Sequence, residues 1–226
     1  MRPAKTLLVL VAFLALPAGA QTTPGGGTSP AAARGMQIDG IAARIGNDVV
    51  TESEVRQLED YQRLVDGQAQ SRGAVIQELV DQWIVRGEAA TTNFPHPTSN
   101  EVAQEFQTLA KQFTSLDNLQ KQMSEMGLTA DAVRQMLEKQ LYYTRFLNYK
   151  FHAAADVTRA QIESYYQKEF TAQLEKRGLA VPPLDKVEAQ IRELLTQETI
   201  NEKAAQWLAD AKAKLKIVIP PTEGSG

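Results

Sequence analysis

Side chains able to do chemistry are few in this chain of 226 residues, and their spacing matches no catalytic motif. The sequence has two histidines and no cysteine, which excludes cysteine nucleophiles, disulfides and cysteine-ligated zinc. The His-Glu-x-x-His, Gly-x-Ser-x-Gly and phosphate-loop patterns are missing. His96 lies between two prolines and His152 at the end of a predicted helix, so we interpret both as surface or boundary residues. The sequence therefore predicts no catalytic residue, no cofactor and no bound metal ion.

Carboxylates are numerous, but their positions favour solvent-exposed helix faces over a catalytic pair. Glu52 and Glu54 fall in the first turn of a predicted helix, where the helix dipole stabilises negative charge. A second charged set, interpreted as a solvated face, consists of Asp185, Lys186, Glu188, Arg192 and Glu193. The chain has 27 acidic and 24 basic residues, a net charge of −3, which argues against a nucleic-acid partner.

Residues 129–151 carry more apolar side chains than one helix-packing face requires. One stripe along this predicted helix contains Val133, Leu137, Leu141 and Thr144, and a second contains Tyr142, Phe146 and Tyr149. Such a helix is either buried on two sides or offers one side to a partner. Methionines, whose flexible side chains suit adaptable binding surfaces, gather nearby. The candidate peptide-binding residues are Met123, Met126, Met136, Tyr142, Phe146 and Tyr149, with burial in a plain core as the alternative.

The first twenty residues predict a signal peptide. Arg2 and Lys5 precede an apolar run over residues 7–16, which is too short to span a bilayer as a helix. Pro17 and the small residues 18–20 follow, so we expect cleavage after Ala20 and a periplasmic location. No later segment is apolar enough for stable membrane insertion. Residues 21–37 are predicted to form a flexible linker, and residues 220–226 a disordered tail.

Between these ends, the pattern predicts a mostly α-helical domain over residues 38–219 with a small antiparallel β-sheet. Alternation in residues 41–45, a turn at residues 46–48 and residues 49–51 predict a β-hairpin. Capping residues and apolar spacing predict helices over residues 52–65, 72–87, 98 onward, 116–126, 129–151 and 158–170. Capping boxes are expected for Thr51 with Glu54, Thr98 with Glu101, and Thr158 with Gln161.

Residues 185–214 predict a final helix of 30 residues. Apolar residues recur at helical spacing near both of its ends, while residues 198–202 between them are polar, so we expect two separate packing faces. These faces consist of Leu184, Val187, Ile191 and Leu194, and of Ala204, Trp207, Ala211 and Leu215. Residues 217–219 alternate as a closing strand. Because a lone hairpin is only marginally stable, we expect this strand to join it and bring the two ends of the domain together.

Residues 41–55, Ile-Ala-Ala-Arg-Ile-Gly-Asn-Asp-Val-Val-Thr-Glu-Ser-Glu-Val, resemble the opening of the SurA family of periplasmic chaperones and of related PrsA-like foldases. The order of the predicted helices, the Trp207-Leu208 pair and the closing strand are also similar to this family. The resemblance implies a chaperone that holds unfolded outer-membrane polypeptides during their passage through the periplasm. Such a holdase needs no catalytic group, only apolar surface that shields its client from water.

The chain departs from this family in one respect. Members usually carry parvulin-type prolyl isomerase domains between the helix that ends near Phe170 and the last helix. Here residues 171–183 leave thirteen positions, too few for such a domain, so we expect the N-terminal chaperone module alone and no enzymatic activity. Two alternatives stay open: a prolyl isomerase with an unrecognised site, and a helical adaptor or homodimer whose aromatic stripe docks one fixed partner.

Overall fold

The computed structural model describes residues 39–220, all of which belong to one compact unit. The predicted signal peptide, the predicted linker and residues 221–226 of the predicted tail lie outside the described residues. None of the helices within residues 39–220 is both long and apolar enough to cross a membrane.

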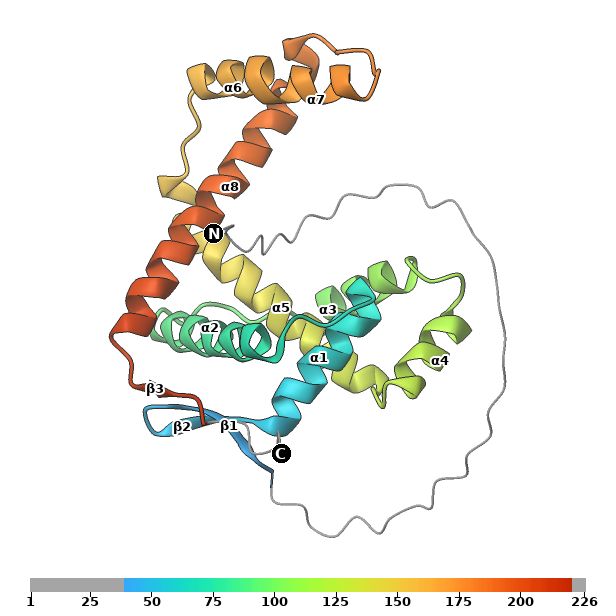
Figure 1. Ribbon diagram of the computed structural model, residues 1–226, viewed down its shortest axis with the longest axis vertical. Helices are drawn as coiled ribbons and strands as arrows, with labels where there is room; N and C mark the ends of the chain where they lie inside the picture. The colour runs from blue at the N-terminus through green and yellow to red at the C-terminus, as the bar shows by residue number, and fades with distance from the viewer. Residues whose placement is uncertain (1–38, 221–226) are drawn as a thin grey trace. The chain divides into compact units, whose positions relative to one another are not determined.

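The two ends of the described chain meet in a three-stranded antiparallel sheet (Figure 1). β1 (Ile41–Ile45) is the central strand, β2 (Asp48–Thr51) pairs with one of its edges and β3 (Ile217–Val218) with the other. The mostly α-helical fold, with a sheet made by the hairpin and the closing strand, is thus confirmed. The closing strand ends one residue earlier than predicted.

Helices make up most of the remaining chain. They are α1 (Glu52–Asp66), α2 (Arg72–Thr91), α3 (Ser99–Ala110), α4 (Leu116–Glu125), α5 (Ala130–Phe151), α6 (Arg159–Tyr165), α7 (Thr171–Lys176) and α8 (Leu184–Ala213), with a 3₁₀ turn at His152–Ala154. The capping boxes predicted at Thr51, Thr98 and Thr158 are all formed. Each one satisfies backbone N–H groups that the first helical turn leaves unpaired, which is why these starts could be predicted locally.

The end of α2 differs from the prediction, because the helix continues four residues beyond Gly87. Ala89, which is fully buried, packs in the core and favours this continuation. The helix stops before Asn93, whose φ of 51° lies in the left-handed region. The Asn93 N–H donates to the Ala90 carbonyl at 3.2 Å, and the Phe94 N–H donates to the Ala89 carbonyl at 3.0 Å. This is a Schellman-type stop in which asparagine takes the usual place of glycine.

The helix predicted to end near Phe170 also continues further. A π-helical turn, Tyr166–Phe170, joins α6 directly to α7. The Tyr166 hydroxyl donates to the Pro182 carbonyl at 2.9 Å and ties this turn to the loop before α8. The predicted connector over residues 171–183 is therefore wrong in part: it contains α7 and a shorter loop of residues 177–183. The extension was missed because no side chain of α7 is buried, so the helix has no apolar pattern.

Buried side chains form two clusters that share α8. The main cluster combines the hairpin, α1 to α5 and the C-terminal half of α8. The smaller cluster packs α6 on the N-terminal half of α8 and consists of Val157, Ile162, Val187 and Ile191. Figure 1 shows α8 running from β3 to the level of α6 and α7. The two predicted packing faces of the last helix are therefore confirmed.

Two details of the last helix differ from the prediction. Leu195 packs against the smaller cluster, whereas Leu194 is 37% exposed. Ile200, inside the stretch expected to be polar, is 2% exposed. Besides α5 and α6, α8 also contacts the 3₁₀ turn at residues 152–154, so its burial is not limited to the two predicted faces.

Candidate peptide-binding surface

The six predicted peptide-binding residues lie at very different depths. Met123 of α4 and Met136, Tyr142 and Phe146 of α5 are buried in the main core, with at most 7% of each residue exposed. Met126 is half-buried against the same core. Tyr149 is 65% exposed. Peptide binding itself stays a prediction for all six.

The chain between α2 and α3 covers most of the second stripe of α5. The ring of Phe94, itself half-buried, has its centroid 5.7 Å from Tyr142, 5.4 Å from Phe146 and 5.2 Å from Tyr149. The Tyr142 hydroxyl donates to the Phe94 carbonyl at 3.4 Å. The His96 ring stacks on Tyr142 with centroids 4.3 Å apart. Phe94 could not be identified from the sequence, since only its place in a proline-rich turn distinguished it and its partners lie far along the chain.

We call the outer faces of Phe94, His96 and Tyr149 the aromatic patch. The His96 side chain is 67% exposed and Tyr149 projects similarly into solvent, while Tyr142 and Phe146 support them from below. Aromatic rings bury large areas on contact with a partner and pack on one another in tilted or stacked geometry. The patch therefore offers a ready contact for apolar or aromatic side chains.

Charged side chains near the aromatic patch are paired. Lys150 Nζ lies 2.7 Å from Glu88 and also sits over the Trp207 ring at 4.9 Å. His96 Nδ1 lies 3.7 Å from a Glu138 carboxylate oxygen. With the Lys150 charge compensated by Glu88, a ligand at the patch would gain free energy mainly through apolar burial.

An ion pair fixes the start of α3 against α5 beside the patch. Arg145 Nη2 lies 2.8 Å from Glu101, which also accepts hydrogen bonds from the Thr98 backbone N–H at 2.7 Å and the Thr98 hydroxyl at 2.8 Å. The hydrogen bond from Arg145, together with those from Thr98, lowers the pKa of Glu101 to about 2. Glu101 is therefore ionised at all ordinary pH values and holds the loop that carries Phe94.

Two carboxyl groups on α2 are half-buried, which the sequence pattern did not predict. Burial raises the pKa of Glu78, although the Gln62 amide donates to it at 2.9 Å. Burial also raises the pKa of Asp81, against the effect of Lys212, whose Nζ lies 2.8 Å away. Their partners are neighbouring core residues, so both groups have structural roles. Among residues 39–220, no three His, Asp or Glu side chains converge as ligands for a metal ion.

Comparison with known proteins gives one informative similarity. No protein-family model matches the chain. The chain is 20% identical over 212 residues to a protein named Chaperone SurA from Ralstonia nicotianae. The aligned region covers 90% of this chain and 41% of that protein, so the chain spans less than half the length of the curated relative it matches. The resemblance inferred from residues 41–55 thus extends, as a distant sequence similarity to a SurA chaperone, over most of the chain.

Proposed function

We propose that this protein is a periplasmic chaperone that binds unfolded polypeptides, among them outer-membrane proteins, and performs no catalysis. The observation that carries the proposal is the aromatic patch: Tyr149 is 65% exposed and packs against the rings of Phe94 and Phe146. The similarity to Chaperone SurA supports the same function. A holdase gains its affinity from apolar contact with exposed aliphatic and aromatic residues of a client, which a surface of this kind supplies.

The six predicted residues have different parts in this proposal. Tyr149 contacts the client directly, with Phe94 beside it. Tyr142 and Phe146 hold these two rings in place. Met126 is half-buried and adds contact area, while Met123 and Met136 are buried in the main core, where methionine adapts its shape at little cost.

The test is suppression of aggregation by protein that starts at residue 21. An unfolded outer-membrane β-barrel is diluted from urea, and light scattering follows its aggregation at near-stoichiometric chaperone. We expect the wild type to slow aggregation and Tyr149→Ser to lose most of this effect. Leu179→Ser is the matched control, because Leu179 is also an exposed apolar residue, at 53%, on the loop before α8. Circular dichroism verifies that all variants are folded.

Each outcome of this assay decides a separate point. Failure of the wild type at large molar excess rejects the chaperone function. Equal loss in Tyr149→Ser and Leu179→Ser rejects the patch as the client site while the function stands. A proline-limited refolding reaction should show no acceleration over buffer, and acceleration would favour the prolyl isomerase.

Light scattering of the protein without a client measures its oligomeric state and so distinguishes the adaptor or homodimer alternative from the chaperone. Phe146 is unsuitable for this test, since it is 1% exposed and its replacement by a charge would disrupt the core. Tyr149→Asp places the charge on the surface instead. A stable dimer that dissociates on Tyr149→Asp would favour the adaptor, whereas we expect a monomer in both cases.

A further inference from the structure

A hollow of about 540 Å³ lies between the chain that follows α5 and the N-terminal half of α8. It is separate from the aromatic patch and contains none of the patch residues. Small apolar side chains line it: Ala153, Ala155, Val157 and Ala189. Ala155 and Val157 are only 3% and 4% exposed. Most of each residue therefore packs inside the protein, which fixes its position in the wall. The hollow exists because alanines fill little of the space between the two segments.

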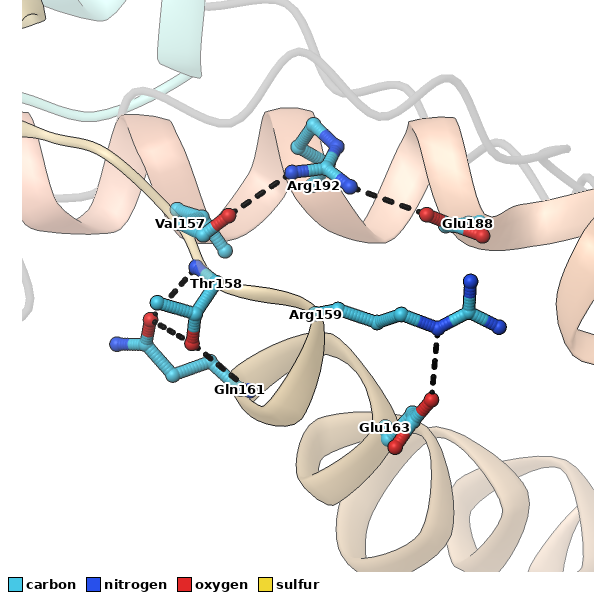
Figure 2. Close-up of polar contacts among 7 residues, drawn as sticks. All are labelled: Val157, Thr158, Arg159, Gln161, Glu163, Glu188 and Arg192. Carbon is cyan, nitrogen blue, oxygen red and sulfur yellow. Dashed lines mark hydrogen bonds and ion pairs between the residues drawn. The ribbon is translucent and has the colours of Figure 1, made fainter.

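One hydrogen bond from an arginine links the two sides of the hollow (Figure 2). Arg192 Nη1 donates to the Val157 carbonyl at 2.8 Å, and Arg192 Nη2 lies 3.0 Å from Glu188 Oε1. The capping box of Thr158 and Gln161 begins α6 directly after this contact. The Arg192 contact and the capping box fix the position of the wall, and a fixed wall reduces the entropy lost on binding.

The charges around the hollow do not cancel. Arg192 is paired with Glu188, and Arg159 is paired with Glu163 at 2.9 Å, as Figure 2 shows. Two further carboxylates, Asp156 and Glu193, line the hollow, together with His152 and Thr196. Both are exposed, and neither has an ion-pair or side-chain hydrogen-bond partner among residues 39–220. The lining residues thus include two carboxylates and one cation, Arg192, which is already paired with Glu188, so negative charge is in excess at the rim.

We infer that this hollow is a second peptide-binding site, which takes a short unfolded segment with a lysine or arginine beside an apolar side chain. The apolar side chain would occupy the alanine-lined floor, and the cationic group would approach Asp156 and Glu193. A volume of about 540 Å³ holds more than one side chain and lies within the range of ordinary ligand pockets, roughly 300–1,000 Å³. The inference rests on the proposed chaperone function, because it assigns a chemical preference to the client. It also gives the two surfaces different tasks, aromatic contact at the patch and cationic contact here.

Nuclear magnetic resonance of the ¹⁵N-labelled full protein tests the site directly. Two Gly/Ser-rich peptides serve as probes: one carries a Leu-Arg-Leu-Arg segment, and the other carries Leu-Glu-Leu-Glu at the same place. We expect the arginine peptide to shift amide signals of residues 152–157 and 189–196 and to bind about tenfold more tightly than the glutamate peptide at low salt. Equal affinity of the two peptides, or shifts confined to other residues, would overturn the inference.

Two variants on the same helix distinguish a site from a general effect. Ala189→Trp places a large ring in the hollow at an exposed position, and Ala205→Trp makes the same change at an exposed alanine outside it. We expect Ala189→Trp to abolish binding of the arginine peptide and Ala205→Trp to leave it unchanged. The double variant Asp156→Asn, Glu193→Gln should remove the preference for arginine over glutamate. Retained binding in Ala189→Trp, or a retained preference in the double variant, contradicts the inference.

Failure here is distinguishable from failure of the proposed function. If the wild type suppresses client aggregation but no arginine peptide binds at residues 152–157, only the second site is rejected. If the peptide binds there and the wild type fails to suppress aggregation, the chaperone function is rejected and the peptide site stands.

Discussion

At the scale of single residues, Glu78 shows a conflict between a charged group and its surroundings. Its carboxylate lies on the core side of α2, and burial outweighs the hydrogen bonds from Gln62 and Gln82 that favour the ionised form. The pKa of Glu78 is therefore higher in the folded protein than in the unfolded chain. Across the interval between these two pKa values the folded state binds more protons, so stability falls as pH rises through it.

The first prediction follows from this sign. Glu78→Gln should raise the free energy of unfolding at neutral pH, because it removes a buried charge and keeps an oxygen that accepts from Gln62. Below the ordinary pKa of a glutamate the two proteins should have nearly equal stability. Urea denaturation at neutral and acidic pH measures the difference. Glu175→Gln, at an exposed residue of α7, serves as the control and should change little at either pH. A gain from Glu78→Gln that is the same at both pH values would contradict the explanation.

Glu101 gives a second prediction with the opposite sign. Its pKa falls from 4.5 to about 2 in the folded protein, since the Arg145 guanidinium and Thr98 bond to the ionised form. The stability it contributes is present above pH 4.5 and is lost as pH falls towards 2. Glu101→Gln should therefore be less stable than the wild type at neutral pH, and the two should converge in strong acid. Thermal denaturation across this pH range checks the convergence, and a constant gap down to pH 2 would show that charge is not the cause.

At the scale of elements, the stop of α2 depends on one backbone conformation. Asn93 has a φ of 51°, which asparagine tolerates, glycine adopts freely and β-branched residues avoid. Asn93→Val should cost about 1–2 kcal/mol, whereas Asn93→Gly should leave stability unchanged or slightly higher. Chemical denaturation of the pair measures this difference, and both variants lack the asparagine side chain. Equal losses in Val and Gly would mean that the side chain of Asn93 matters more than its φ.

The helix boundaries also show which features of the fold could be predicted from the sequence. The starts at Thr51, Thr98 and Thr158 were predictable because each cap involves residues three positions apart. The end of α2 could not be predicted, because Gly87 is a weak stop signal beside a buried Ala89.

The candidate site was predicted only in part. The aromatic spacing of α5 identified the helix that carries Tyr149, but the packing of the aromatic patch depends on Phe94, a partner that local periodicity cannot reveal. The hollow beside α8 was missed for the same reason, since Arg192 reaches across to the Val157 carbonyl.

At the scale of the whole molecule, α8 connects parts of the chain that are far apart in sequence. Its C-terminal half packs on the main core and leads into β3, which pairs with β1. Lys212 of α8 makes an ion pair with Asp81 of α2, and both side chains are less than 30% exposed. This contact fixes the helix beside the sheet that joins the two ends. A half-buried ion pair is more costly to break on one side than to replace as a unit.

The last prediction is therefore a comparison of three variants at this pair. Lys212→Met should destabilise the protein by about 2 kcal/mol at neutral pH, since it leaves the Asp81 carboxylate without its cation. Asp81→Leu should cost less, because the flexible Lys212 side chain can turn its ammonium group to solvent. The double variant Lys212→Met, Asp81→Leu should have nearly the same free energy of unfolding as the wild type.

The loss of stability in Lys212→Met should also shrink at acidic pH, where Asp81 is protonated, because the pKa of Asp81 is already raised by burial. Urea denaturation at two pH values provides these numbers. If the double variant loses as much as the two single variants combined, Lys212 and Asp81 are not energetically coupled, and an unpaired carboxylate is not the cause of the loss in Lys212→Met.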